Sequence, residues 1–196
     1  MRYNKIRKMD IYNGPGIRIS IFMQGCTFNC KNCFNPDTHD FNGGKEFTDD
    51  TINRVIELAS PEHIEGLSIL GGEPLHPKNL KGTTELAKKF REIYPDKTIW
   101  VWSGFLFDDL KDKEIMNYID VLVDGQFKDE LKNYSLKFRG SSNQRVIDVP
   151  QSISLPIKEE PFLHANDYFN RNGEQNVSYS TVFKSEQREF PCCDRR

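Results

Sequence analysis

Residues 24–35 read QGCTFNCKNCFN and hold three of the five cysteines of the chain, with the spacing C-x3-C-x2-C. Thiolates are soft ligands, and cysteines this close together can reach one metal centre from a single loop. Closed zinc sites and closed iron–sulfur clusters take four protein ligands, so Cys26, Cys30 and Cys33 on a four-iron cluster would leave one iron open. A zinc knuckle that takes His39 as its fourth ligand is the alternative, although zinc spacings usually use pairs of cysteines or histidines.

The cysteine stretch follows a predicted strand over residues 17–23, which is rich in β-branched residues and alternates in polarity. Residues 1–16 are interpreted as a polar segment that ends in the turn NGPG at residues 13–16. A second turn, GGEP at residues 71–74, follows a predicted buried strand over residues 66–70. Ligands bind at the C-terminal ends of strands in open α/β sheets and in barrels, so both motifs are expected at one site.

The two motifs together resemble those of the radical S-adenosylmethionine (SAM) enzymes. In that superfamily the open iron of a [4Fe-4S] cluster holds the amino and carboxylate groups of SAM, and an electron from the cluster cleaves SAM to methionine and a 5′-deoxyadenosyl radical. The resemblance implies that Cys26, Cys30 and Cys33 hold the cluster. It also implies that Glu73 accepts hydrogen bonds from the SAM amino group, as suits a carboxylate facing a cationic amine.

The resemblance extends to later strand ends. Ser103 follows a predicted strand over residues 98–102 and is expected near the SAM carboxylate or ribose, unless it is a turn serine. Asp124 follows a predicted strand over residues 121–123 and is expected to contact the ribose or a monovalent cation, unless it is a capping aspartate. The superfamily usually has an aromatic residue before the third cysteine, where this chain has Asn32, so the backbone of residues 32–34 is expected to serve the adenine. The expected cofactor-binding residues are Asn32, Cys33, Phe34, Gly71, Gly72, Glu73, Pro74, Ser103 and Asp124.

The NGPG turn continues into Ile17 and Arg18, and this lead-in resembles that of the glycyl-radical-enzyme activases, a branch of the same superfamily. Residues 119–149 resemble the activases of anaerobic ribonucleotide reductase, and the whole resemblance covers roughly residues 1–150. It implies that the chain makes a glycyl radical on the large subunit of that reductase, with an electron donor such as a flavodoxin. The alternative for Arg18 is a surface cation.

Two other functions stay open. One is a different radical SAM enzyme, either another glycyl radical activase or a small-metabolite enzyme such as a deazapurine synthase, which needs a closed substrate pocket. The other is a non-catalytic iron–sulfur or zinc module, which needs a fourth protein ligand and has no use for Glu73. The polar run at residues 138–145 contains Arg139 and Arg145, for which phosphate binding and a solvated loop are both considered.

Three β-α-β passes are predicted, with helices that begin at Thr48 and that cover residues 79–94 and 106–118. Such passes give a parallel sheet with helical crossovers, so the expected fold class is α/β. The regular part of the chain is shorter than the ~200 residues of a closed barrel, which favours a partial, open (β/α) barrel of the radical SAM type. A last strand is expected at residues 146–149. Residues 1–150 are predicted to form the radical SAM domain, and residues 151–196 a C-terminal extension that is loosely structured or docked on the core.

Composition and charge limit the partners and the cellular compartment that are expected for this chain. The net charge of −2 argues against a nucleic-acid partner, and no apolar run approaches the ~20 residues of a membrane span. The polar N-terminus does not resemble a signal peptide. Five cysteines, three of them clustered, favour a reducing cytoplasm over a disulfide framework. Cys192 and Cys193 are interpreted as tail residues and not as ligands.

Overall fold

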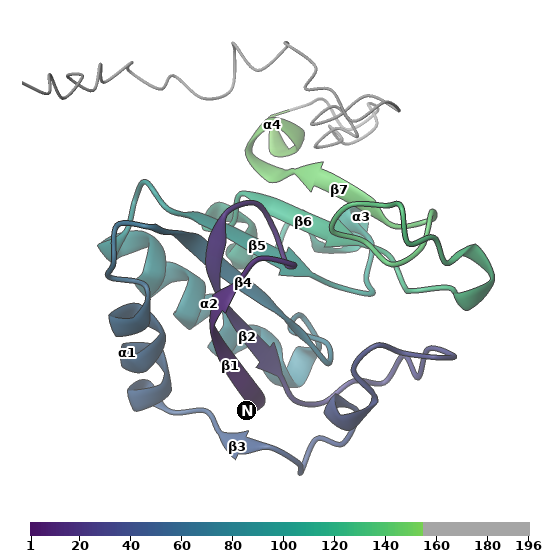
Figure 1. The fold of residues 1–196 in the computed structure, drawn as a ribbon, viewed down its shortest axis with the longest axis horizontal. Helices are drawn as coiled ribbons and strands as arrows, with labels where there is room; N and C mark the ends of the chain where they lie inside the picture. Colours follow the sequence, from purple (N-terminus) through teal and green to yellow (C-terminus); the bar gives the residue numbers. More distant parts are fainter. Residues whose placement is uncertain (155–196) are drawn as a thin grey trace, which may run out of the picture. The chain divides into compact units, whose positions relative to one another are not determined.

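The computed structural model describes residues 1–154, which form a β-sheet with helices packed against it (Figure 1). Its seven strands lie in the order β3-β1-β2-β4-β5-β6-β7. Strands β2, β4, β5 and β6 run parallel to one another, whereas β1, β3 and β7 are antiparallel to their neighbours. The strands are β1 (Arg2–Asp10), β2 (Ile17–Met23), β3 (Lys45–Glu46), β4 (Ile64–Gly71), β5 (Thr98–Trp102), β6 (Val121–Asp124) and β7 (Arg145–Asp148).

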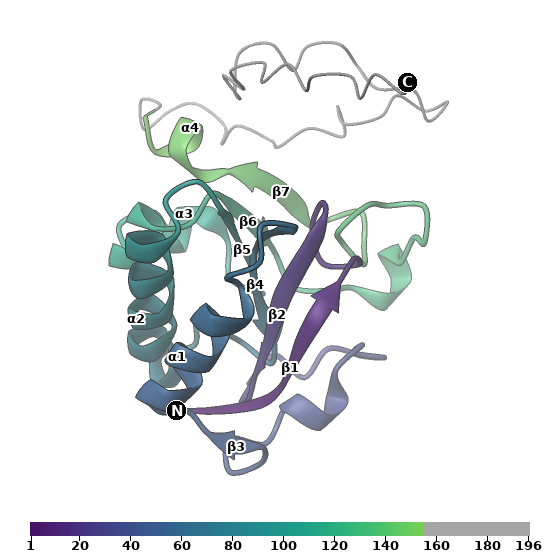
Figure 2. The same ribbon diagram turned by 60° about the vertical axis from the view of Figure 1, so that its left-hand side comes forward.

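The two long helices, α1 and α2, lie on the same face of this sheet, as Figure 2 shows. Each connects two neighbouring parallel strands, which is the predicted β-α-β arrangement. No helix within residues 1–154 has the length and apolar character needed to cross a membrane. The helices are α1 (Asp49–Leu58), α2 (Pro77–Ile93), α3 (Phe107–Leu110) and α4 (Val149–Ile153), with short 3-10 turns η1 (Pro36–Thr38), η2 (Glu114–Asn117) and η3 (Asp129–Leu131).

The α/β class is confirmed, and the predicted parallel sheet forms the centre of a mixed sheet whose two ends are antiparallel. The N-terminal segment, expected to be polar and turn-like, forms strand β1 and pairs with β2. Its residues are mostly half-buried or exposed, so it lacks the apolar character by which a strand is recognised in a sequence. The last strand, β7, returns antiparallel to β6.

The predicted helix over residues 106–118 is also corrected, because α3 and η2 are separate short elements there. Phe107 and Leu110 of α3 are buried, and so are Ile115 and Met116 of η2. In a continuous helix, Met116 would lie on roughly the opposite side from Phe107, since successive residues turn by about 100°. Breaking the helix lets both side chains reach the core.

The predicted domain boundary after residue 150 falls within α4. Residues 155–196, with Cys192 and Cys193, lie outside the described residues. The division into two domains therefore stays a prediction.

The central strands are buried on both faces. Alternate residues such as Ile19, Ile21 and Leu67 belong to the core beneath α1 and α2. The intervening positions face the other way, where Trp100 and Val123 belong to a second, smaller apolar cluster. Parallel sheets buried on both faces are expected to read as nearly continuous apolar runs.

Arg18 interrupts that apolar run and is fully buried, which excludes the alternative of a surface cation. Its guanidinium donates hydrogen bonds to the Ser68 hydroxyl (2.8 Å), to the Thr98 hydroxyl and carbonyl (2.8 Å each), and to the Leu67 carbonyl (2.9 Å). Gly14 adopts φ +109°, and a Cβ at this position would lie 2.8 Å from the Arg18 side chain. The NGPG turn is thus packed on an arginine that ties β2 to β4 and β5.

Candidate iron–sulfur and cofactor site

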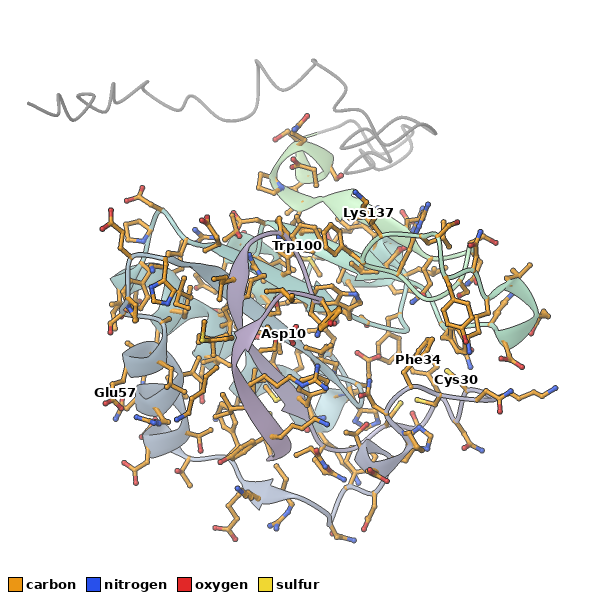
Figure 3. All side chains as sticks on the ribbon, viewed as in Figure 1. Asp10, Cys30, Phe34, Glu57, Trp100 and Lys137 are labelled. Carbon is orange, nitrogen blue, oxygen red and sulfur yellow. The ribbon has the colours of Figure 1, made fainter. Side chains whose placement is uncertain are left out.

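Four strands deliver their C-terminal ends to one pocket. The cysteine loop follows β2, the GGEP turn follows β4, Ser103 and Gly104 follow β5, and Gly125 follows β6. The pocket has a cavity volume of about 140 Å³ and is partly open to solvent. Figure 3 shows Cys30 and Phe34 close together at this edge of the sheet. The lining residues are Cys26, Phe28, Cys30, Cys33, Phe34, Asn35, His39, Leu70, Gly71, Gly72, Glu73, Trp102, Ser103, Gly104, Gly125, Gln126, Phe127 and Gln144.

All three cysteines of the loop line this pocket as free, half-buried thiols. A tight turn brings the last two together, because the Cys33 amide donates to the Cys30 carbonyl (3.2 Å). The Asn35 amide donates to the Cys33 sulfur (3.4 Å). Burial raises the pKa of the Cys26 and Cys33 thiols, and a backbone hydrogen bond to each sulfur opposes the shift. Bringing thiolates together here therefore calls for a metal centre that stabilises them.

Within residues 1–154, no group of three or more histidine, cysteine, aspartate or glutamate side chains is arranged to hold a single metal ion. His39 lines the pocket together with the three thiols, and a zinc knuckle would need all four side chains to converge on one ion. A four-iron cluster instead presents a different iron to each cysteine, and the sulfurs need not converge on one point. The donor set, three thiols around one pocket, fits a cluster of that kind.

The GGEP turn is packed directly against the start of the cysteine loop. The Gly72 amide donates to the Met23 carbonyl, and the Glu73 amide donates to the Gly25 carbonyl, both at 2.9 Å. A Cβ on Gly72 would lie 2.7 Å from the Gly25 carbonyl oxygen and 2.8 Å from that of Thr38. Glycine is required at position 72 because another backbone comes this close.

Glu73 is 1% exposed, and its carboxylate accepts three hydrogen bonds from the chain. Oε1 accepts from the Leu75 amide (2.9 Å) and the Ser103 hydroxyl (2.8 Å), and Oε2 accepts from the Gly104 amide (2.7 Å). Burial raises the pKa of Glu73 to about 7, although these hydrogen bonds oppose the shift. A carboxylate has about four acceptor positions, so one remains on Oε2.

Residues 12–147 match the family model described as "4Fe-4S single cluster domain". The chain is also similar to curated proteins named anaerobic ribonucleoside-triphosphate reductase-activating protein. That of phage T4 is 37% identical over 146 residues, which are 74% of this chain and 93% of the relative. Those of Salmonella typhi and Escherichia coli K12 are 40% identical over 150 residues, 74% of this chain and 97% of each relative. The chain belongs to the family of anaerobic ribonucleoside-triphosphate reductase-activating proteins. Its cofactor is a 4Fe-4S cluster.

Not every residue predicted from the sequence lines the pocket of this activating-protein family member. Ser103 does, but its hydroxyl donates to Glu73 and accepts from the Phe105 amide (3.1 Å). Asn32 is exposed, and its side chain donates to the Asp129 carboxylate (2.7 Å). Pro74 does not line the pocket. The roles of these residues toward SAM stay predictions.

Asp124 is fully buried beside the pocket without lining it. One carboxylate oxygen accepts from the Phe107 amide (2.8 Å) at the start of α3, as in the capping alternative. Arg145 pairs with both oxygens, with Nε 3.0 Å from Oδ1. The Arg145 guanidinium is thus engaged by a carboxylate, which removes the basis for its binding phosphate. Contact of Asp124 with the ribose or with a monovalent cation stays a prediction.

The sequence analysis missed the segment that holds the cysteine loop in place from the far side. Gln126 donates from Nε2 to the Phe28 carbonyl (3.2 Å), and the Phe127 ring packs on Phe34 with centroids 5.0 Å apart. Both residues line the pocket. Gln126 and Phe127 come directly after Asp124 and Gly125, at the end of a predicted strand. Position at a strand end is the signal from which Asp124 was predicted as a site residue, and it applies equally to these two.

Gln144 explains the polar run at residues 138–145. Its side-chain amide donates to the Gly125 carbonyl (3.0 Å), and its oxygen accepts from the amides of Gly140 (2.9 Å) and Ser141 (3.2 Å). Arg139 donates to the Gln144 carbonyl (2.6 Å). The run is therefore an internally bonded loop that shapes the segment next to the pocket.

Proposed function

We propose that this chain is an activase that generates a glycyl radical on the large subunit of anaerobic ribonucleotide reductase by reductive cleavage of SAM. The observation that carries the proposal is the sharing of one pocket by three thiols and a buried carboxylate with one open acceptor position. When bound, the cluster supplies one electron that cleaves SAM to methionine and a 5′-deoxyadenosyl radical, which takes a hydrogen atom from a glycine Cα. The names of the relatives support the choice of reductase.

Different residues bind the cluster and SAM. Cys26, Cys30 and Cys33 hold the cluster, and Oε2 of Glu73 accepts a hydrogen bond from the SAM ammonium. Because the Glu73 carboxylate is already held by the backbone and by Ser103, it needs little reorganisation when the ligand arrives.

Backbone next to these side chains completes the proposed SAM site. Gly71, Gly72 and Pro74 shape the turn, and glycine lets the ligand approach the main chain closely. The backbone of Asn32, Cys33 and Phe34 serves the adenine.

Aromatic side chains wall the site against water. Phe28 packs edge-on against Phe105, with centroids 5.0 Å apart, and a Cβ on Gly104 would overlap the Phe28 ring. Trp102 lines the same pocket. A reactive radical needs a site from which water is excluded, and this wall supplies part of it.

The sheet is proposed to be the open half of a (β/α) barrel of the radical SAM type. Within the described residues, strands β3 and β7 are its two edges, which are not paired with each other. An open side admits a protein substrate, and the partner then supplies the missing wall. The domain division at residue 150, a flavodoxin-like electron donor and a reducing cytoplasmic setting belong to the same proposal.

The experiment is anaerobic activation of the purified large subunit by reconstituted, reduced protein and SAM. The expected result is a glycyl radical doublet by electron paramagnetic resonance, together with methionine and 5′-deoxyadenosine. A large-subunit variant without the acceptor glycine should give no doublet. Fast SAM cleavage driven by a small molecule, with no doublet from cluster-loaded protein, would establish the metabolite-enzyme alternative instead.

A further inference from the structure

Asn79 is a buried polar residue at the start of α2 to which the proposed function gives no task. It is 1% exposed and lies in the first turn of the helix, which His76 caps. Asparagine is a weaker helix former than alanine or leucine, and burying its amide costs free energy unless hydrogen-bond partners are present. Neither helix stability nor apolar packing accounts for an asparagine at this position, so its contacts must.

The side-chain amide of Asn79 joins the two cofactor motifs. Nδ2 donates to the carbonyl of Gln24, two residues before Cys26, and to the carbonyl of Glu73 in the GGEP turn, both at 3.0 Å. An amide nitrogen carries two N–H donors, so both are used. Asparagine side chains favour backbone groups nearby in the sequence, whereas Gln24 lies 55 residues earlier. Asn79 therefore links the segment that precedes the cluster ligands to the residue that carries the carboxylate.

The cysteine loop is closed at its base independently of α2. The Gly25 amide donates to the Thr38 carbonyl (2.7 Å). The Gln24 side chain is 1% exposed, and its Nε2 donates to the carbonyls of Asp37 (2.9 Å) and Asp40 (2.8 Å). These contacts shape the loop from within, so the loop should still hold its cluster when its link to α2 is removed.

A second side chain of α2 fastens the GGEP turn alone. Thr83 is fully buried, and its hydroxyl donates to the Pro74 carbonyl (2.8 Å). It lies one helical turn after Asn79, on the same face of the helix. Thr83 thus supports the turn, whereas Asn79 supports the turn and the start of the cysteine loop together, and the two roles can be separated by substitution.

We propose that Asn79 is a positioning residue that sets the placement of the Glu73 carboxylate relative to the cluster. The inference rests on the proposed function, in which SAM is held by Glu73 and by the cluster at the same time. A ligand held at two points depends on the distance between them, and a displacement of about 1 Å in such a site can cost about a hundredfold in rate. Asn79 does not line the pocket, so it acts through the two backbones that it joins and not by touching SAM.

The test replaces Asn79 by aspartate, which has nearly the same shape. An ionised aspartate has no donor and a protonated one has a single O–H, so at most one of the two carbonyls keeps its partner. In cluster-loaded Asn79→Asp, the Kd for SAM from equilibrium dialysis should rise about tenfold. SAM cleavage by chemically reduced protein at saturating SAM should also slow about tenfold, because the bound SAM is misaligned. Iron content should equal that of the unaltered protein.

A second variant covers the case in which aspartate prevents folding. Asn79→Ala removes the donor without placing another oxygen against the two carbonyls. It should show the same pattern, with a rise of about fivefold in the Kd for SAM.

Three controls separate positioning from general loosening of the helix. Asn53→Asp makes the same chemical change at an exposed position of α1. Tyr94→Phe removes a hydrogen bond to the Ile56 carbonyl (2.9 Å) at the far end of α2. Both should leave the Kd for SAM and the saturated cleavage rate unchanged. Thr83→Val, which frees only the turn, should raise the Kd by less than about twofold.

The outcomes distinguish the inference from the proposed function. If the unaltered protein binds and cleaves SAM but Asn79→Asp and Asn79→Ala behave like Asn53→Asp, the positioning role is wrong and the activase function stands. Equal effects of Asn79→Asp and Thr83→Val would show that α2 only supports the turn, which also contradicts the inference. Loss of iron from both Asn79 variants would mean that Asn79 stabilises the cysteine loop itself, again against the inference. Failure of the unaltered, cluster-loaded protein to bind SAM would overturn the proposed function.

Discussion

The hydrogen-bonding of Glu73 allows a prediction with a pH signature. Glu73→Ala removes the acceptor of the Leu75 and Gly104 amides and of the Ser103 hydroxyl. Each such hydrogen bond contributes about 1 kcal/mol, so near pH 5 we expect the free energy of unfolding to fall by about 3 kcal/mol. SAM affinity should fall about ten- to hundredfold at pH 8, because a hydrogen bond to a charged group is worth roughly 1.5–3 kcal/mol.

Because the pKa of Glu73 is raised, the loss of stability and the loss of SAM affinity in Glu73→Ala should depend on pH in opposite directions. The pKa is raised from 4.5 to about 7 in the folded protein, so the folded state holds an extra proton between these values. The free energy of unfolding therefore falls as pH rises through this window, by about 3 kcal/mol in all. The cost of Glu73→Ala to stability should shrink accordingly toward pH 8. SAM affinity in the unaltered protein should instead rise with pH through about 7, as the carboxylate forms.

The assays are anaerobic urea unfolding and equilibrium dialysis with labelled SAM, both on cluster-loaded protein from pH 5 to 8. Glu57→Ala is the control, since Glu57 is exposed and forms a short-range pair with Arg54 on α1. We expect this control to leave SAM affinity unchanged and to change stability by less than about 0.5 kcal/mol. An unchanged SAM affinity in Glu73→Ala, with the cluster retained, would refute the role of the carboxylate and leave GGEP as a turn.

Three further predictions concern the cluster and the sheet. Alanine at any one of the three loop cysteines should abolish the four-iron signal, whereas replacing Cys192 and Cys193 together should preserve it; the check is iron content and electron paramagnetic resonance. Arg18→Leu should lower the free energy of unfolding by about 3 kcal/mol or more, because it leaves buried hydrogen-bond acceptors on β4 and β5 without a donor. A urea midpoint equal to that of the unaltered protein would contradict this. Gln126→Ala should speed chelator-driven iron loss a few-fold by freeing the Phe28 carbonyl of the cysteine loop, with thermal stability nearly unchanged; equal iron-loss rates count against the holding role of this segment.

Short-range patterns were sufficient to place two motifs at one pocket. The cysteine spacing and the GGEP turn lie within single loops, and each follows a strand whose apolar residues mark it in the sequence. Because parallel strands end at the same edge of a sheet, two motifs after two such strands meet at one pocket. The α/β class and the central strands β2, β4, β5 and β6 were predictable for the same reason.

Partners far apart in the chain were decided by the tertiary structure. Ser103 was assigned a contact with SAM from its place after β5, but the register of β5 beside β4 brings its hydroxyl to Glu73, thirty residues earlier. Asp124 and Arg145 form a pair because β7 returns antiparallel to β6. Strand β1 is recognisable by its pairing with β2, since its own residues are largely polar.

The sequence by itself brought the three cysteines and the GGEP turn to one pocket, because the spacing of each motif is set within one loop that follows a parallel strand. Whether a charged side chain in this protein is a free ligand or a structural contact was decided by the fold. Arg18 is surrounded by acceptors from β4 and β5, and Glu73 by donors that follow β4 and β5. A buried charge must find such partners, and they come from strands that the sheet alone brings together.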